Sequence, residues 1–328
     1  MPWERSARLP EVEAVSAAVL ILAVVAIGCI PAANALAAAS WPRRAPAAAI
    51  LLWQALGLAW GLAAVGALIG FGVAAPGAAV ATGAFAKLAS LARTGGLRSA
   101  PDLIGGIRLL CLGAGLALLA VLCWILVAAS ASVLRARQRQ HVLLSLLAHG
   151  DPKVPGALVV DHPAAAAYCL PGLRSAIVIS AGTLDLLDAD ELAAVLAHER
   201  AHLRERHDLV LLPFLALLRA FRWSGTAGRA YQAVGLLVEM HADDRALQQR
   251  PARELATALL RVGAAGGGSV PSGALAAASR TEECEVAARV IRLLRPTPGL
   301  SNSVVALVIS AAAAIVTIPA ALLVLPLH

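Results

Sequence analysis

The sequence predicts a mainly α-helical polytopic membrane protein with about four transmembrane helices and a polar domain between the third and the fourth. Hydrophobic residues make up 59% of the 328 residues. Charged residues make up only 14%, against roughly 25% in soluble domains. Four charge-free stretches each exceed the ~20 apolar residues that cross a bilayer as a helix; they cover 14–42, 45–86, 109–134 and 296–327.

The first apolar stretch is predicted to stay in the membrane rather than to be cleaved as a signal peptide. The segment before it, MPWERSARLPEVEAV, carries three acids beside two arginines, and the stretch itself has the length of a span. Arginine pairs or triplets flank the spans at Arg43 and Arg44 and again at Arg135, Arg137 and Arg139. The positive-inside rule places both clusters in the cytoplasm. We therefore expect a multi-pass plasma-membrane protein whose polar domain is cytosolic.

The second apolar stretch contains two glycine pairs at four-residue spacing, Gly57 with Gly61 and Gly66 with Gly70. Small residues at this spacing let helices approach closely. The pairs fit either a homodimer seam or packing between helices of one chain, and the abundance of small residues in spans favours the second interpretation. Residues 76–106, rich in Gly, Ala and Pro, are expected to form an outer loop with room for a short surface helix.

These boundaries divide the chain into three parts. Residues 1–134 form the membrane domain with three transmembrane helices, residues 135–302 form the cytosolic domain, and residues 303–328 form the fourth transmembrane helix. The cytosolic part carries nineteen basic and sixteen acidic residues, a balance too even for a nucleic-acid-binding surface. The expected partners are therefore the lipid bilayer and a protein, without direct contact to nucleic acid.

Short β-branched runs bounded by Pro and Gly predict strands at 156–163 and 176–180, with an extended segment at 164–172 between them. A small sheet is expected here. Tyr168 and Cys169 lie on the middle segment, where a peptide can add to a sheet edge as another strand. By default Cys169 is interpreted as a small core residue.

The next element is a predicted helix from about Ala189 to about His207. Asp188 and Glu191 form a capping-box pattern before an apolar run. The following apolar stretch, 209–221, is too short to span a bilayer, so we expect it to be buried or to lie against the membrane.

The stretch VLAHERAHLRERHD, residues 195–208, lies on this helix and carries the chemistry. His198 and His202 are four residues apart, so both imidazoles project from one face and can bind one cation, with Glu199 beside them. In such an HExxH site two imidazoles and a carboxylate hold zinc and leave a position for water, which the glutamate deprotonates as it attacks a peptide carbonyl. The predicted cofactor is Zn²⁺, and the predicted base is Glu199.

The third metal ligand is predicted in LLVEMHADDRAL, on a second helix. Glu239 supplies the carboxylate, and Asp243, one turn later, is placed to orient a ligating histidine. The alternative is that both acids pair with arginines on a solvated face. His207 and His241 are interpreted as solvent-facing or capping residues, with a role in the site as the alternative.

The HERAH helix, the ExxxD pattern of VEMHADD, and the order of three spans, catalytic domain and final span resemble the BlaR/MecR-type family of integral-membrane zinc peptidases. They resemble the HtpX/Ste24-type membrane proteases more loosely. The resemblance covers nearly the whole chain. It implies a gluzincin-like α+β zinc-protease domain with a cytosolic active site, zinc ligands His198, His202 and Glu239, and Glu199 as base.

In antibiotic-sensing members of this family, activation leads to cleavage of a DNA-bound repressor and to expression of resistance genes. Their extracellular penicillin-binding domain follows the last span, whereas this sequence stops at His328, so direct sensing of β-lactams by acylation is not expected. The alanine- and arginine-rich composition resembles that of a high-GC bacterium.

Three functions are compatible with these motifs. The first is a regulated endopeptidase that cleaves a cytosolic repressor, and the second is a general quality-control protease for membrane proteins. The third is a non-catalytic scaffold with a structural metal. It is disfavoured because Glu199, which is not needed as a ligand, is the residue that hydrolysis requires.

Overall fold

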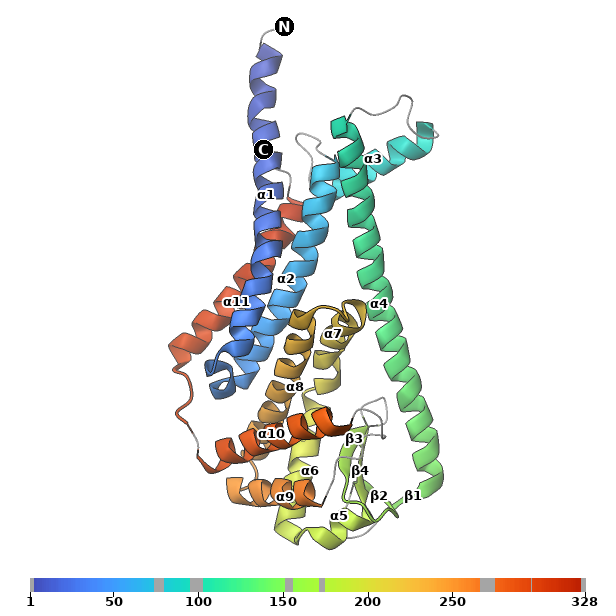
Figure 1. Cartoon of the computed structure of the whole chain (residues 1–328), viewed down its shortest axis with the longest axis vertical. Coiled ribbons are helices and arrows are strands. Elements are labelled where there is room, and N and C mark those ends of the chain that lie inside the picture. The colour runs from blue at the N-terminus through green and yellow to red at the C-terminus, as the bar shows by residue number, and fades with distance from the viewer. Residues whose placement is uncertain are drawn as a thin grey trace.

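The computed structural model describes residues 3–73, 80–94, 103–150, 156–170, 175–265, 275–295 and 297–325. Within this part of the chain, four helices are long and apolar enough to cross a membrane, which confirms the predicted polytopic, mainly α-helical class. Figure 1 shows the first, second and fourth of these helices at one end of the molecule and the small sheet at the other, with α7 (His207–Ala220) and α8 (Gly225–Ala246) between them. The third helix runs along the molecule as far as the sheet. The four candidate spans are Ala17–Ala38, Pro46–Val73, Leu103–Gln140 and Asn302–Val324.

Helix α2 (Pro46–Val73) is the centre of the membrane part. Helices α1 (Trp3–Ala38), α4 (Leu103–Leu147) and α11 (Asn302–Val324) all pack against it. A four-residue 3-10 turn, η1 (Trp41–Arg44), joins α1 to α2 and contains the first arginine pair.

The glycines Gly66 and Gly70 of α2 serve packing within the chain. A Cβ added at Gly66 would lie 2.7 Å from Cδ2 of Leu323 on α11, and one added at Gly70 would lie 2.9 Å from Cγ2 of Val19 on α1. Real Cβ atoms do not approach neighbours so closely, so a side chain at either position would force the Leu323 or Val19 methyl group to move, and the two glycines allow the helices to pack closely as they are.

The segment predicted as an outer loop contains a helix, α3 (Val80–Thr94), which packs against α2 and α11. Residues 74–79 and 95–102 lie outside the described part of the chain. Helix α4 then runs without a break from Leu103 to Leu147, so the predicted end of the membrane domain, residue 134, lies inside this helix.

A four-stranded sheet follows α4. All three predicted segments form strands, namely β2 (Ala157–Val160), β3 (Ala167–Leu170) and β4 (Ala176–Ser180), and β1 (Ala148–Gly150) adds a strand that its sequence, AHG, did not indicate. The strand order is β1-β2-β4-β3; β2 and β4 are parallel and the other pairs are antiparallel. Strand β3 is therefore an edge strand, as the peptide-addition hypothesis requires.

Helix α6 (Ala189–Arg204) begins where the capping box predicts. The Asp188 carboxylate accepts hydrogen bonds from the backbone N–H groups of Asp190 and Glu191, and the Asp188 N–H donates to Glu191 Oε2 at 3.1 Å. The short helix α5 (Ala181–Leu186) precedes it.

The predicted end of this helix near His207 is wrong. The chain leaves α6 at Glu205, adopts a left-handed conformation at Arg206 (φ 52°), and begins α7 (His207–Ala220) at the next residue. A non-glycine residue in this conformation costs about 1–2 kcal/mol. The segment RERHD contains no glycine or proline, so its sequence does not predict that the helix ends here. The turn directs the apolar stretch toward the membrane helices, where Phe214 packs edge-on against Trp53.

Helices α8 (Gly225–Ala246), α9 (Ala252–Ala264) and α10 (Leu275–Leu294) complete the domain. One apolar core joins it to the membrane part: α1 and α2 contribute Leu36 and Trp53, α7 contributes Phe214, and α8 contributes Val234 and Leu237. Because this core is continuous, the polar domain is docked on the membrane helices rather than tethered to them.

Candidate metal centre

Helices α6 and α8 pack side by side and bring the three predicted metal ligands together. The Nε2 atoms of His198 and His202 lie 3.0 Å apart, and the Glu239 carboxylate oxygens lie 3.4 Å from the first and 3.5 Å from the second. Metal–ligand bonds of about 2.0–2.1 Å in a tetrahedral zinc site put ligand atoms about 3.3 Å apart. The donor types and their spacing therefore fit a four-coordinate ion such as zinc.

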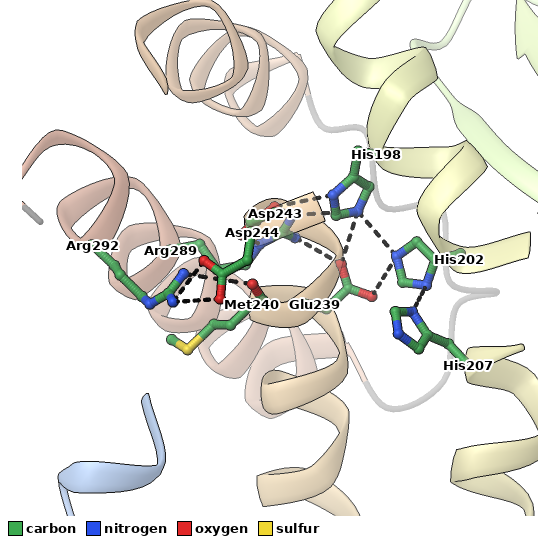
Figure 2. Close-up of polar contacts among 9 residues, drawn as sticks. All are labelled: His198, His202, His207, Glu239, Met240, Asp243, Asp244, Arg289 and Arg292. Atoms are coloured by element: carbon green, nitrogen blue, oxygen red, sulfur yellow. Dashed lines mark hydrogen bonds and ion pairs between the residues drawn. The ribbon is translucent and has the colours of Figure 1, made fainter. Parts of the chain in front are cut away.

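The far sides of the two imidazoles are held by different partners. His198 Nδ1 lies 3.0 Å from Asp243 Oδ1, and His202 Nδ1 lies 3.0 Å from His207 Nδ1. Figure 2 shows both Nε2 atoms turned toward Glu239. Asp243 thus occupies the orienting position expected for it, one turn after Glu239 on α8. It is fully buried, which rules out a solvated face at this residue.

Arg289 of α10 belongs to the site and was missed in the sequence. Its Nε and Nη2 donate to the two oxygens of Asp243 at 2.9 Å and 2.7 Å, and its Nη1 lies 2.9 Å from Glu239 Oε2. The sequence did contain a signal. Val286, Val290 and Leu293 form the apolar stripe of α10, and Arg289 occupies a position on that stripe. An arginine on a buried helix face needs an acidic partner.

Charge balance keeps the carboxylates ionised. Burial alone would raise the pKa values of Glu239 and Asp243, but hydrogen bonds from the histidines and Arg289 outweigh it and lower both. Burial lowers the pKa of His198, but its hydrogen bonds to Asp243 and Glu239 have the larger combined effect and raise the pKa to about 9. The carboxylates are therefore in the deprotonated state that a metal ligand or its partner requires.

Glu199 lies on α6 beside these ligands and lines the same cavity, which has a volume of about 480 Å³. Burial raises the pKa of its carboxyl group, although the neighbouring His198 and His202 oppose the shift. A base whose pKa is raised toward neutrality accepts a proton more effectively than an ordinary surface carboxylate. The position and environment of Glu199 suit the role of base.

The edge strand β3 borders this cavity. Tyr168 is 41% exposed, and Cys169, which is half-buried, lines the cavity together with Glu199. The interpretation of Cys169 as a small core residue is therefore wrong. Burial and the Glu199 charge raise the pKa of its thiol to about 12, so it is protonated at neutral pH and is not a thiolate ligand.

The comparison with known families agrees with this geometry. Residues 133–284 match the model of Peptidase family M48. The match supports assignment to the M48 metallopeptidases and, with it, metallopeptidase activity; M48 peptidases are typically zinc enzymes. No curated protein and no solved structure matches the chain significantly. Assignment to the BlaR/MecR-type or the HtpX/Ste24-type stays a prediction.

The matched region contains two further histidines near the three candidate metal ligands. His207 is 2% exposed, so its interpretation as a solvent-facing residue is wrong. The ring centroids of His202 and His207 lie 4.8 Å apart, and those of His207 and His241 lie 5.5 Å apart. Burial, assisted by the neighbouring histidines, lowers the pKa of His207 to about 3. His207 is therefore a neutral ring in contact with a metal ligand.

Proposed function

We propose that the protein is a membrane-embedded zinc endopeptidase whose catalytic domain faces the cytosol. The observation that carries this proposal is the convergence of His198, His202 and Glu239 at tetrahedral spacing, with Glu199 in the same cavity. The M48 match over this region and the four candidate spans support it. The arginine clusters that flank the spans support the cytosolic orientation.

The residues present can divide the reaction between them. Bound by His198, His202 and Glu239, zinc would supply a Lewis acid that acidifies a water molecule and polarises the substrate carbonyl. Glu199 accepts a proton from this water as the water oxygen attacks the peptide carbonyl carbon. The same carboxyl group then gives the proton to the departing nitrogen as the C–N bond breaks.

The edge of the sheet offers a place for the substrate. A peptide that adds to β3 in extended form would pass Tyr168 and Cys169 and bring its backbone to the cavity that Glu199 lines. Backbone hydrogen bonds then supply affinity, and the cavity selects the side chains next to the scissile bond.

We further propose that the substrate is a cytosolic transcriptional repressor, so that cleavage transmits a signal from the membrane to gene expression. The support is the resemblance to the BlaR/MecR-type peptidases in both motifs and in the order of the spans. A general quality-control protease would use the same chemistry on many membrane proteins.

The proposal is tested by comparing the proteomes of cells that carry the native chain, the Glu199→Gln variant, or the control Arg200→Gln. Arg200 is exposed and adjacent in sequence, so its substitution leaves the cavity unchanged. We expect one DNA-binding protein to accumulate in the Glu199→Gln cells alone. Accumulation of many unrelated membrane proteins would instead favour quality control, and identical proteomes would contradict both.

A further inference from the structure

The contact between His207 and His202 is not explained by the reaction as described. We propose that His207 is a positioning residue that accepts a hydrogen bond from His202 and so holds this ligand in its metal-binding tautomer. The inference rests on the proposed metal site, and it assigns a role to a side chain outside the group of three candidate ligands.

The nitrogen that His202 turns toward the proposed metal site decides which ring donates the hydrogen bond and which accepts it. The two Nδ1 atoms lie 3.0 Å apart, which is a hydrogen-bonding distance only if one nitrogen carries a proton and the other does not. His202 Nε2 faces His198 and Glu239, where it must present a lone pair to a metal. The His202 proton is therefore on Nδ1, and His207 Nδ1 is the acceptor.

The two ligating histidines thus differ in their supports. His198 faces the carboxylate of Asp243, whereas His202 faces the imidazole ring of His207. A carboxylate partner makes a ligating imidazole more basic. A ring-nitrogen acceptor increases this basicity less than a carboxylate does, but it fixes the orientation of the ligating ring equally. His207 therefore holds the orientation of the His202 ring through a ring nitrogen, in the place where His198 has a carboxylate oxygen.

The break in the helix is what brings the two rings together. Helix positions three and four apart share a face, whereas His207 follows His202 by five and would point away if α6 continued. The left-handed residue Arg206 ends α6 and starts α7 so that the His207 ring turns back onto His202. Backbone strain of this kind is maintained where the surrounding structure requires it.

Two substitutions separate hydrogen bonding from packing. In His207→Asn the side-chain oxygen lies about where Nδ1 was, so the hydrogen-bond acceptor is kept. In His207→Leu the side chain still fills the space, but the acceptor is lost. His241→Asn is the matched control because the His241 ring packs on His207 and has Glu205 as its own ion-pair partner.

Zinc affinity should be measured by competition with a chelator, using the full-length protein in detergent. All variants should be made in a Glu199→Gln background, so that the reading does not depend on peptidase activity. We expect His207→Leu to weaken zinc binding by about 10–100-fold, while His207→Asn and His241→Asn stay near the reference value. The inference is overturned if His207→Leu binds zinc normally, or if His207→Asn loses as much affinity as His207→Leu.

A measurement without substitution at His207 covers the case in which the variants fail to fold. Nitrogen NMR of ¹⁵N-histidine in the zinc-loaded protein should show His207 protonated on Nε2 and His202 on Nδ1. A proton on His207 Nδ1 would overturn the inference. Failure of the proposed function has a different signature, because a chain without peptidase activity would still give these tautomers and affinities.

Discussion

Arg289 shows how single residues set the chemistry of the metal centre. Its guanidinium group pairs with Asp243 and Glu239 from a helix that contributes no metal ligand. Together with the histidines, this positive charge stabilises the ionised form of both acids. The contact converts two adjacent carboxylates from mutually repelling groups into one metal ligand and one orienting partner.

We expect Arg289→Met to lower the free energy of unfolding by about 3–5 kcal/mol, because it leaves the buried Asp243 carboxylate without its partner. Arg289→Met combined with Asp243→Asn should lose less than Arg289→Met alone. Denaturant unfolding of the native chain, both single variants and the double variant gives the coupling energy. Losses that simply add would show that the two side chains do not depend on one another.

Glu199 and the metal ligands can be separated by substitution. We expect Glu199→Gln to keep about one zinc ion per chain while peptide hydrolysis slows by about 10²-fold or more, because the amide cannot accept the proton. His202→Ala should lose the zinc. Metal analysis and a peptidase assay on the same preparations check both, and a Glu199→Gln enzyme with native activity would disprove the hydrolytic mechanism.

At the scale of single elements, α6 depends on its N-terminal cap. The Asp188 carboxylate accepts two backbone hydrogen bonds, and Glu191, which completes the box, is also paired with Arg261 of α9 at 2.8 Å. We expect Asp188→Ala to cost about 1 kcal/mol of stability. Asp190→Ala in the same turn is the control, since its contact with Arg250 is long and exposed. Melting temperatures check the difference, and equal values would contradict it.

The sequence predicted the parts of this site that depend on local periodicity. The HExxH spacing, the ExxxD spacing and the capping box each lie within one helix, so helical geometry alone aligned their side chains. Arg289 was missed, and a role in the site was only the alternative interpretation of His207, because tertiary packing decides what both residues do. Arg289 reaches the site from α10, and His207 reaches it only through the left-handed break at Arg206.

At the scale of the whole molecule, Arg292 connects the membrane part to the metal centre. Its Nε donates to the backbone oxygen of Arg43 in η1 at 2.8 Å, and its Nη2 pairs with Asp244 at 2.7 Å. Arg292 follows Arg289 by one turn of α10. The turn between the first two membrane helices is thus joined through α10 to the residues that orient the metal ligands.

We expect Arg292→Met to destabilise the protein by about 1–3 kcal/mol, because Asp244 and the Arg43 carbonyl lose their donor. Arg295→Met is the control, since Arg295 is exposed in the next turn. The two variants should be compared by thermal unfolding in detergent. If the two variants have the same melting temperature, the link between η1 and α10 does not contribute to stability.

Topology is tested by reporter fusions. We expect a reporter fused after Arg139 to be cytoplasmic and one fused at His328 to be external, because the arginine clusters flank the spans as that orientation requires. A reporter active on one side only, such as alkaline phosphatase, checks each position. The opposite pattern would place the catalytic domain outside and remove every cytosolic repressor from consideration.

The distance along the chain between Arg289 and Asp243, 46 residues, also determines when the site can form. A ribosome makes a protein from its N-terminus, so all three metal donors and Asp243 are synthesised before α10 exists. Until α10 emerges, Asp243 has no guanidinium partner and its burial is unfavourable. The last membrane helix, α11, is made directly afterwards. The helix that completes the candidate metal site and the helix that forms the fourth candidate span are therefore synthesised one directly after the other.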